Sequence, residues 1–304
     1  MKIGSTIAYY VLKTIWLSYS IIPLPVMYVI SDILFYPFYY LIRYRRKIVR
    51  KNLRIAFPEK EEKELIRLER RFYHFFLDVL FEMNKYASIS ERGIRKRMSF
   101  KNTEEVNSIL ESGDSISLYV GHYCNWEWVS SMPLHLYKGS LPAQIYHKLR
   151  NKAVDKLLYQ NRKRFGAINV EMKETLRWVN EQLSNNRVTI TGYIADQSPR
   201  KKHAHYFIDF FNRSTPVLTG TEKITKRYKL KAYYLDIKRI KRGYYEASFI
   251  KLHDNPSSLP DFELTNIYYQ HLENMIRRQP ELYLWSHNRF KHSKRKEETN
   301  ESNI

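Results

Sequence analysis

The stretch "SISLYVGHYCNWEW", residues 115–128, combines a strand pattern with a cluster of polar and aromatic side chains. Its apolar residues recur at a period of two: Ile116, Leu118 and Val120. This alternation predicts a strand that ends at Gly121. Asn125 is a favoured N-cap residue and predicts that a helix begins near it. His122 therefore lies on a predicted strand-to-helix turn.

The turn can bring His122 and Glu127 together. On one regular helix, residues five positions apart point about 140° away from each other. At a strand-to-helix turn, Glu127 in the first helical turn can point back towards the imidazole. The carboxylate would then hold one ring nitrogen and leave the other free as a general base. A structural histidine beside a helix-capping glutamate is the alternative, and the H-x4-E spacing alone does not exclude it.

The rest of the chain alternates predicted strands and helices. Strands are predicted at 143–147, 167–170 and 188–194, a hairpin over 231–252, and helices within 57–87 and over 147–165, 173–184 and 262–279. This order predicts an α/β fold in which a mixed β-sheet is flanked by helices. The chain has nine glycines and neither a phosphate-binding loop nor a dinucleotide fingerprint.

The N-terminal region is apolar enough to reach a membrane. Residues 15–42 contain a single charged residue, Asp32, and exceed the length of about 20 residues that a spanning helix needs. Three prolines interrupt the segment: Pro23, Pro25 and Pro37. Two membrane-anchoring arrangements remain open, one kinked span or two short helices in the interface. A buried hairpin of core helices is the structural alternative.

A basic segment follows the apolar one. Residues 43–54 carry seven basic residues and no acid. Such a flank favours an anionic membrane surface and, by the positive-inside rule, the cytoplasmic side. The sequence therefore predicts a membrane anchor at 1–45, an α/β domain at 46–290 and a charged, disordered tail at 291–304.

Composition narrows the possible functions. The formal net charge is +21, and the chain holds 25 Tyr and 15 Phe, which suits an anionic partner. A membrane-tethered nucleic-acid binder fits this composition, but no recognition helix, RNA-binding signature or zinc-finger spacing accompanies it, so no nucleic acid is expected. A non-catalytic membrane scaffold is the other alternative. The single cysteine, Cys124, excludes internal disulfides and cysteine-based zinc sites.

Six segments in order resemble the late acyltransferases of lipid A biosynthesis, a membrane-bound family with an H-x4-D/E motif in the lysophospholipid acyltransferase-like superfamily. The resemblance covers nearly the whole chain. The segments are "RKNLRIAFPE" (50–59), "GHYCNWE" (121–127), "NRKRFGA" (161–167), "ADQSP" (195–199), "DFFNRSTPVLTG" (209–220) and "PELYLWSHNRFK" (280–291).

The resemblance implies a glycerolphosphate-acyltransferase-like fold and an O-acyltransferase without metal or cofactor. The donor would be an acyl thioester on acyl carrier protein, and the acceptor a hydroxyl of an acylated glycolipid, a lipid A precursor. A lysophospholipid or aminolipid acceptor is the alternative. By resemblance, His122 is the general base and Glu127 its orienting partner. Arg164 would contact the acceptor phosphate or support the site, and Asp196 and Gln197 would line it. The enzyme would lie in the bacterial inner membrane with its catalytic domain on the cytoplasmic face.

Overall fold

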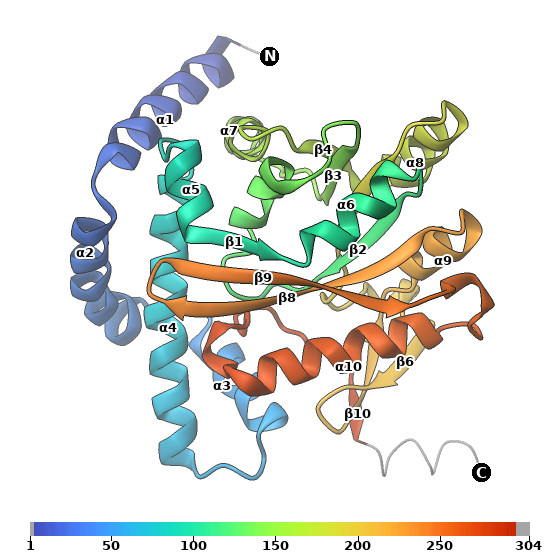
Figure 1. Cartoon of the computed structure of the whole chain (residues 1–304). Helices are drawn as coiled ribbons and strands as arrows, with labels where there is room; N and C mark the ends of the chain where they lie inside the picture. The colour runs from blue at the N-terminus through green and yellow to red at the C-terminus, as the bar shows by residue number, and fades with distance from the viewer. Residues whose placement is uncertain (1–2, 296–304) are drawn as a thin grey trace.

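A computed structural model describes residues 3–295, which fold around a seven-stranded sheet. Figure 1 shows the helices that surround it. The strand order is β1-β9-β8-β2-β5-β3-β4. Neighbouring strands are parallel except β8 and β9, which form an antiparallel hairpin. The bounds are β1 (Met98–Lys101), β2 (Ile116–Val120), β3 (Leu141–Tyr146), β4 (Ile168–Glu171), β5 (Thr189–Ile194), β8 (Lys231–Lys241) and β9 (Tyr244–His253). The predicted mixed sheet flanked by helices is confirmed.

β2 lies between β8 and β5 in the middle of the sheet. All five of its residues are buried. The alternation of apolar and polar residues in this strand therefore does not separate a solvent-exposed face from a buried one. Both faces are covered, as is usual for central parallel strands, and polar Ser117 is buried along with its apolar neighbours.

Helices connect and cover the strands. Their bounds are α5 (Glu91–Arg97), α6 (Thr103–Glu111), α7 (Lys152–Arg162), α8 (Thr175–Ser184), α9 (Gly220–Arg227) and α10 (Glu263–Arg278). A second sheet has the order β10-β7-β6, with β6 (Tyr206–Asp209), β7 (Arg213–Val217) and β10 (Lys294–Arg295). β10 lies in the segment predicted as a disordered tail, and the rest of that tail, residues 296–304, is outside the described residues.

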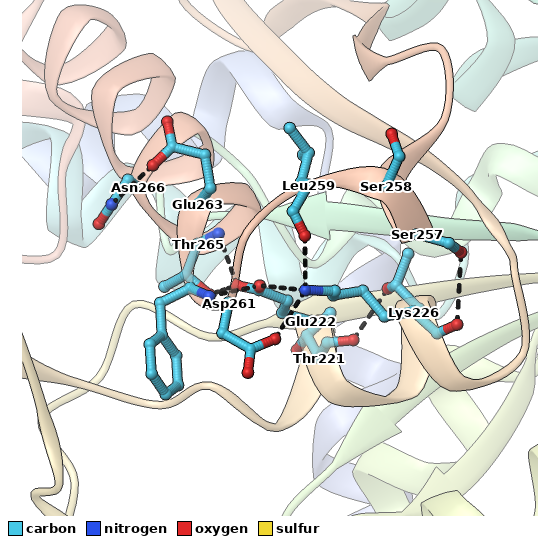
Figure 2. A network of polar contacts seen from close by, with 12 residues as sticks. Thr221, Glu222, Lys226, Ser257, Ser258, Leu259, Asp261, Glu263, Thr265 and Asn266 are labelled. Carbon is cyan, nitrogen blue, oxygen red and sulfur yellow. Dashed lines mark hydrogen bonds and ion pairs between the residues drawn. The ribbon is translucent and has the colours of Figure 1, made fainter.

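The start of α10 is fixed by a buried carboxylate from α9. Glu222 accepts hydrogen bonds from the backbone amides of Phe262 at 2.7 Å and Thr265 at 2.9 Å (Figure 2). An acid at a helix N-terminus satisfies free N–H groups and stabilises the helix dipole. Lys226 closes the network by donating to the Leu259 carbonyl and to Asp261. This anchoring matters for the site because α10 packs against the end of β2.

The N-terminal third forms α1 (Ile3–Ile21), α2 (Leu24–Tyr36), the π-helical turn η1 (Pro37–Ile42), α3 (Arg46–Ala56) and α4 (Glu62–Lys85). In Figure 1, α1 and α2 form an arc along the outer side of α4. The chain breaks between α1 and α2 at Pro23, as the prolines predicted. Leu24–Ile42 is the only stretch within the described residues that is long and apolar enough to cross a membrane.

The apolar segment is fastened to the α/β domain. Met27 and Tyr39 are fully buried in the same core cluster as the central strands. Arg242, at the β8–β9 turn, binds both Asp32 on α2 and Asp78 on α4, at 2.8 Å and 2.6 Å. Part of the predicted anchor at 1–45 therefore packs into the core of the α/β domain, and the boundary at 45/46 stays a prediction. The outer side of α2 is apolar and exposed.

Candidate active site

The site lies where two parallel neighbours of the sheet end. β2 and β5 are in register up to Val120 and Ile194. His122 and Asp196 each follow two residues later, so they leave the sheet side by side. The carboxyl ends of adjacent parallel strands are a common place for functional groups in α/β folds.

Asp196 holds His122 through two contacts. Its Oδ1 lies 2.6 Å from Nδ1 of the imidazole, and its Oδ2 accepts the backbone amide of His122 at 3.0 Å. The carboxylate is 1% exposed. Burial alone would raise the pKa of Asp196, but the adjacent His122 ring and its hydrogen bonds hold the pKa below its ordinary value. Asp196 is therefore an ionised acceptor, and Nδ1 of His122 carries a proton.

The other imidazole nitrogen faces a polar group at the surface. Nε2 of His122 lies 3.2 Å from the side-chain nitrogen of the exposed residue Gln197. With a proton on Nδ1, Nε2 keeps its lone pair and accepts from the Gln197 amide. The Trp126 ring stands edge-on to the imidazole, with centroids 5.4 Å apart. The arrangement gives one oriented basic nitrogen beside an aromatic wall.

The expected contact between Glu127 and His122 is not formed among the described residues. Arg162, the last residue of α7, takes both Glu127 oxygens instead, with Nη2–Oε1 at 2.6 Å and Nε–Oε2 at 2.9 Å. The physical reason is local. The helix predicted to begin near Asn125 begins at Trp128 and is a 3₁₀ helix, η2 (Trp128–His135). Glu127 thus precedes the helix and turns towards α7.

Comparison with known proteins decides the family. A model of the bacterial lipid A biosynthesis acyltransferases matches residues 2–292. The chain belongs to this family. It is 24% identical over 239 residues to a lipid A biosynthesis acyltransferase of Haemophilus influenzae, covering 77% of this chain and 72% of that protein. The chain is therefore an acyltransferase of lipid A biosynthesis, and the family resemblance drawn from its sequence motifs is confirmed.

In this acyltransferase, a buried acid holds the turn between His122 and Glu127 in place. Glu82 on α4 accepts hydrogen bonds from Asn125, Tyr28 and Tyr245, each at 2.7 Å. The other end of the Asn125 side chain accepts the Trp128 amide at 3.1 Å, which matches its predicted capping role. One carboxylate thus connects the turn between His122 and Glu127 with α2, α4 and β9.

Two small residues shape the turn. A Cβ on Gly121 would lie 2.6 Å from Leu272 Cδ1 of α10, so glycine allows the strand end to approach that helix. Cys124 is fully buried, and burial raises the pKa of its thiol well above the usual value. A thiol in this state is a poor nucleophile.

Arg164 lies beside the turn but points elsewhere. Its Nη1 donates to the Tyr86 carbonyl at 2.6 Å, and its guanidinium stacks on Phe165. Arg162, two residues earlier, forms the salt bridge with Glu127, and the sequence motifs did not predict this role. The sequence signal was present, because both arginines belong to the "NRKRFGA" segment.

A further cation near Asp196 also escaped the sequence analysis. Arg289 is 0% exposed. It donates hydrogen bonds to the Pro216 carbonyl at 3.1 Å and to the Tyr269 hydroxyl at 3.2 Å. Tyr269 in turn donates to the carbonyl of Ala195, next to Asp196. The positive charge of Arg289 also favours the ionised form of Asp196. The only signal was its place in the closing "WSHNRF" segment, residues 285–290.

Proposed function

We propose that the enzyme moves a fatty acyl chain from an acyl thioester, carried by acyl carrier protein, to a hydroxyl of an acylated glycolipid that serves as a lipid A precursor. The observation that carries the reaction type is the imidazole of His122, held by Asp196 on Nδ1, with Nε2 facing only the exposed side chain of Gln197 among the described hydrogen-bond partners. Family membership supports the acceptor class.

In this mechanism His122 is the general base. Nε2 takes the proton from the acceptor hydroxyl, whose oxygen attacks the thioester carbonyl carbon. The tetrahedral intermediate collapses, the carbon–sulfur bond breaks, and the departing thiolate takes the proton from Nε2. Asp196 keeps the proton on Nδ1 and stabilises the imidazolium between the two transfers. The amide of Gln197 occupies the position where the acceptor hydroxyl would bind.

Glu127 keeps a place in the proposed site, with a different partner from the one first expected. We assign it to holding the Arg162 guanidinium at the edge of the site through two hydrogen bonds. Arg164 is assigned to support the site from behind, through the Tyr86 carbonyl. The proposed donor, acyl carrier protein, is acidic, and the strongly basic chain with its net charge of +21 suits such a partner.

We place the enzyme at the bacterial inner membrane with the catalytic domain on the cytoplasmic face. The exposed apolar side of α2 supports a membrane contact. The basic segment 43–54 directly follows it and supports contact with an anionic membrane surface and cytoplasmic orientation.

The test is acyl transfer by the purified full chain in detergent, with acyl carrier protein thioester as donor. Mass spectrometry should find the glycolipid acceptor heavier by one acyl chain. His122→Ala should lower the rate by about 10²–10⁴-fold, because a positioned base is lost, with an unchanged circular dichroism spectrum. Transfer to a lysophospholipid but not to the glycolipid would replace the proposed acceptor. Equal rates for His122→Ala and wild type would remove the mechanism.

A further inference from the structure

A hollow lies between α3 and the β6–β7 turn. It has a volume of about 530 Å³, in the range of small-ligand sites. Lys51 and Arg54 line it from α3, and Arg213 lines it from the start of β7. Ile55 and Phe211 give it an apolar wall. No carboxylate is among its described lining residues.

Among the cations that line the hollow, Arg54 already binds Glu62 at 2.7 Å. Arg46 and Arg50 bind the buried carboxylate of Glu69, at 2.7 Å and 2.8 Å, and are committed to the fold. Within the described part of the chain, Lys51 and Arg213 form no ion pair. Unpaired cations that converge on one hollow from two separate elements are suited to an anionic ligand.

The turn that forms one wall has an uncommon backbone. Phe211 and Asn212 both have positive φ angles, 54° and 56°, in a two-residue hairpin closed by Phe210 and Arg213. This conformation favours glycine or asparagine, so it costs energy at phenylalanine. Glu273 of α10 accepts the Phe211 amide at 2.8 Å and helps to hold the turn. The conformation presents Phe211 and Arg213 to the same hollow.

The hollow is near both the membrane segment and the catalytic base. α3 begins four residues after η1, the end of the apolar stretch. On the other side, the Phe211 ring packs edge-on to Trp285. Residue Leu284, next to it, donates its amide to the His122 carbonyl at 3.1 Å. One short segment therefore separates the hollow from the turn that carries the base.

We propose that this hollow binds a phosphate-bearing headgroup of the acylated glycolipid acceptor. Lys51 and Arg213 take the phosphate oxygens, and the half-buried side chain of Ile55 takes an apolar part of the same molecule. An amphiphile that rises from the bilayer next to α2 would meet the hollow before its hydroxyl reaches His122. This inference rests on the proposed function, because it assigns a subsite to that acceptor.

The test compares acceptors with and without phosphate, at saturating donor, using the full chain in detergent. Lys51→Ala and Arg213→Ala should each raise KM for the phosphorylated glycolipid about tenfold, because a charge-assisted hydrogen bond is lost, with kcat nearly unchanged. For the dephosphorylated glycolipid, both variants should match wild type. Lys47→Ala is the matched control, an exposed lysine one turn earlier on α3 that does not line the hollow.

Several results would overturn the assignment. One is an unchanged KM in both variants, and another is an equal rise in the Lys47→Ala control. A rise in KM for the thioester donor instead would show that the hollow serves acyl carrier protein. Inorganic phosphate should inhibit only weakly, since it lacks the apolar part, and half-inhibition at a phosphate concentration near the KM of the phosphorylated glycolipid would indicate a free-phosphate site. Failure of the proposed function differs from all of these, because wild type would then acylate neither glycolipid.

Discussion

A neutral imidazole accepts a proton only at the nitrogen that keeps its lone pair, so the group bound to the other nitrogen decides whether a histidine is a useful base. In this enzyme that group is Asp196, buried and ionised, 2.6 Å from Nδ1 of His122. Glu127 is a second carboxylate close by in sequence, but a guanidinium occupies both of its oxygens. At the scale of single residues, the two carboxylates therefore have different tasks.

Replacement of each carboxylate by its amide separates these tasks. Asp196→Asn should lower kcat by about 10²–10⁴-fold, since the amide no longer fixes the proton on Nδ1. Steady-state kinetics with the glycolipid acceptor measure this loss, and an unchanged circular dichroism spectrum shows that the fold is kept.

Glu127→Gln is the matched control for that measurement. Its remaining carbonyl oxygen still accepts from Arg162, so we expect kcat to fall by no more than about tenfold. The opposite pattern, a large loss of kcat in Glu127→Gln and a small one in Asp196→Asn, would show that Glu127 orients the base during turnover.

The sequence predicts the residues of the candidate site, but it does not predict which of them contact each other. His122, Glu127, Asp196 and Gln197 were all identified from motifs and from their places after predicted strands. The partner of His122 depends on which strands are neighbours, and Asp196 is 74 residues away along the chain. A local spacing argument favours the nearer carboxylate. Only the parallel pairing of β2 with β5 brings the distant one to the imidazole.

At the scale of elements, Glu82 ties four segments together. It stands on α4 and receives hydrogen bonds from α2, β9 and the turn after β2. Burial raises its pKa to about 7, although those hydrogen bonds favour the charged form. A carboxylate buried this deeply is costly when ionised, and the three donors offset part of that cost.

The raised pKa predicts how stability changes with pH. The folded state keeps the Glu82 proton up to about pH 7, whereas an ordinary carboxyl releases it near 4.5. The free energy of unfolding should therefore fall as pH rises between these values, by an amount on the order of 3 kcal/mol. Glu82→Gln resembles the protonated form and should lose less stability over the same range. Denaturant unfolding in detergent at several pH values gives both curves, and parallel curves would contradict the prediction.

Long periodic elements were predictable, and short ones that depend on distant partners were not. The hairpin predicted over 231–252 is β8–β9, and the helix predicted over 262–279 is α10, which ends before Pro280. α7 is shorter than the predicted 147–165 because Asn151 caps it, accepting the amides of Ala153 and Val154. β1 has only four residues and pairs with β9 far along the chain, so no local pattern marks it. The β6–β7 hairpin was missed because its turn has phenylalanine where glycine is the usual signal.

At the scale of the whole molecule, the net charge of +21 overstates the number of basic side chains that are free to bind an anionic membrane surface. Within the basic segment, Arg46 and Arg50 bind Glu69, and Arg54 binds Glu62. Arg45 donates to the Ser286 carbonyl. Because only part of this segment faces solvent unpaired, the electrostatic attraction to an anionic leaflet is smaller than seven charges suggest. The apolar surface of the N-terminal helices then has to supply most of the affinity.

That surface gives a test of membrane binding that leaves the fold intact. Val26, Val29 and Ile33 lie on the outer side of α2 and are 48%, 58% and 64% exposed, so changing all three to Ser should not disturb the core. Burial of the exposed half of each side chain in lipid is worth about half of the roughly 1.5–3 kcal/mol for full burial, so the triple variant should shift from the membrane pellet towards the soluble fraction. The matched control changes Met172, Leu176 and Ile240, which are 54%, 46% and 61% exposed on other elements. It should stay in the pellet with wild type, and equal release of both variants would mean that α2 is not the membrane-binding face.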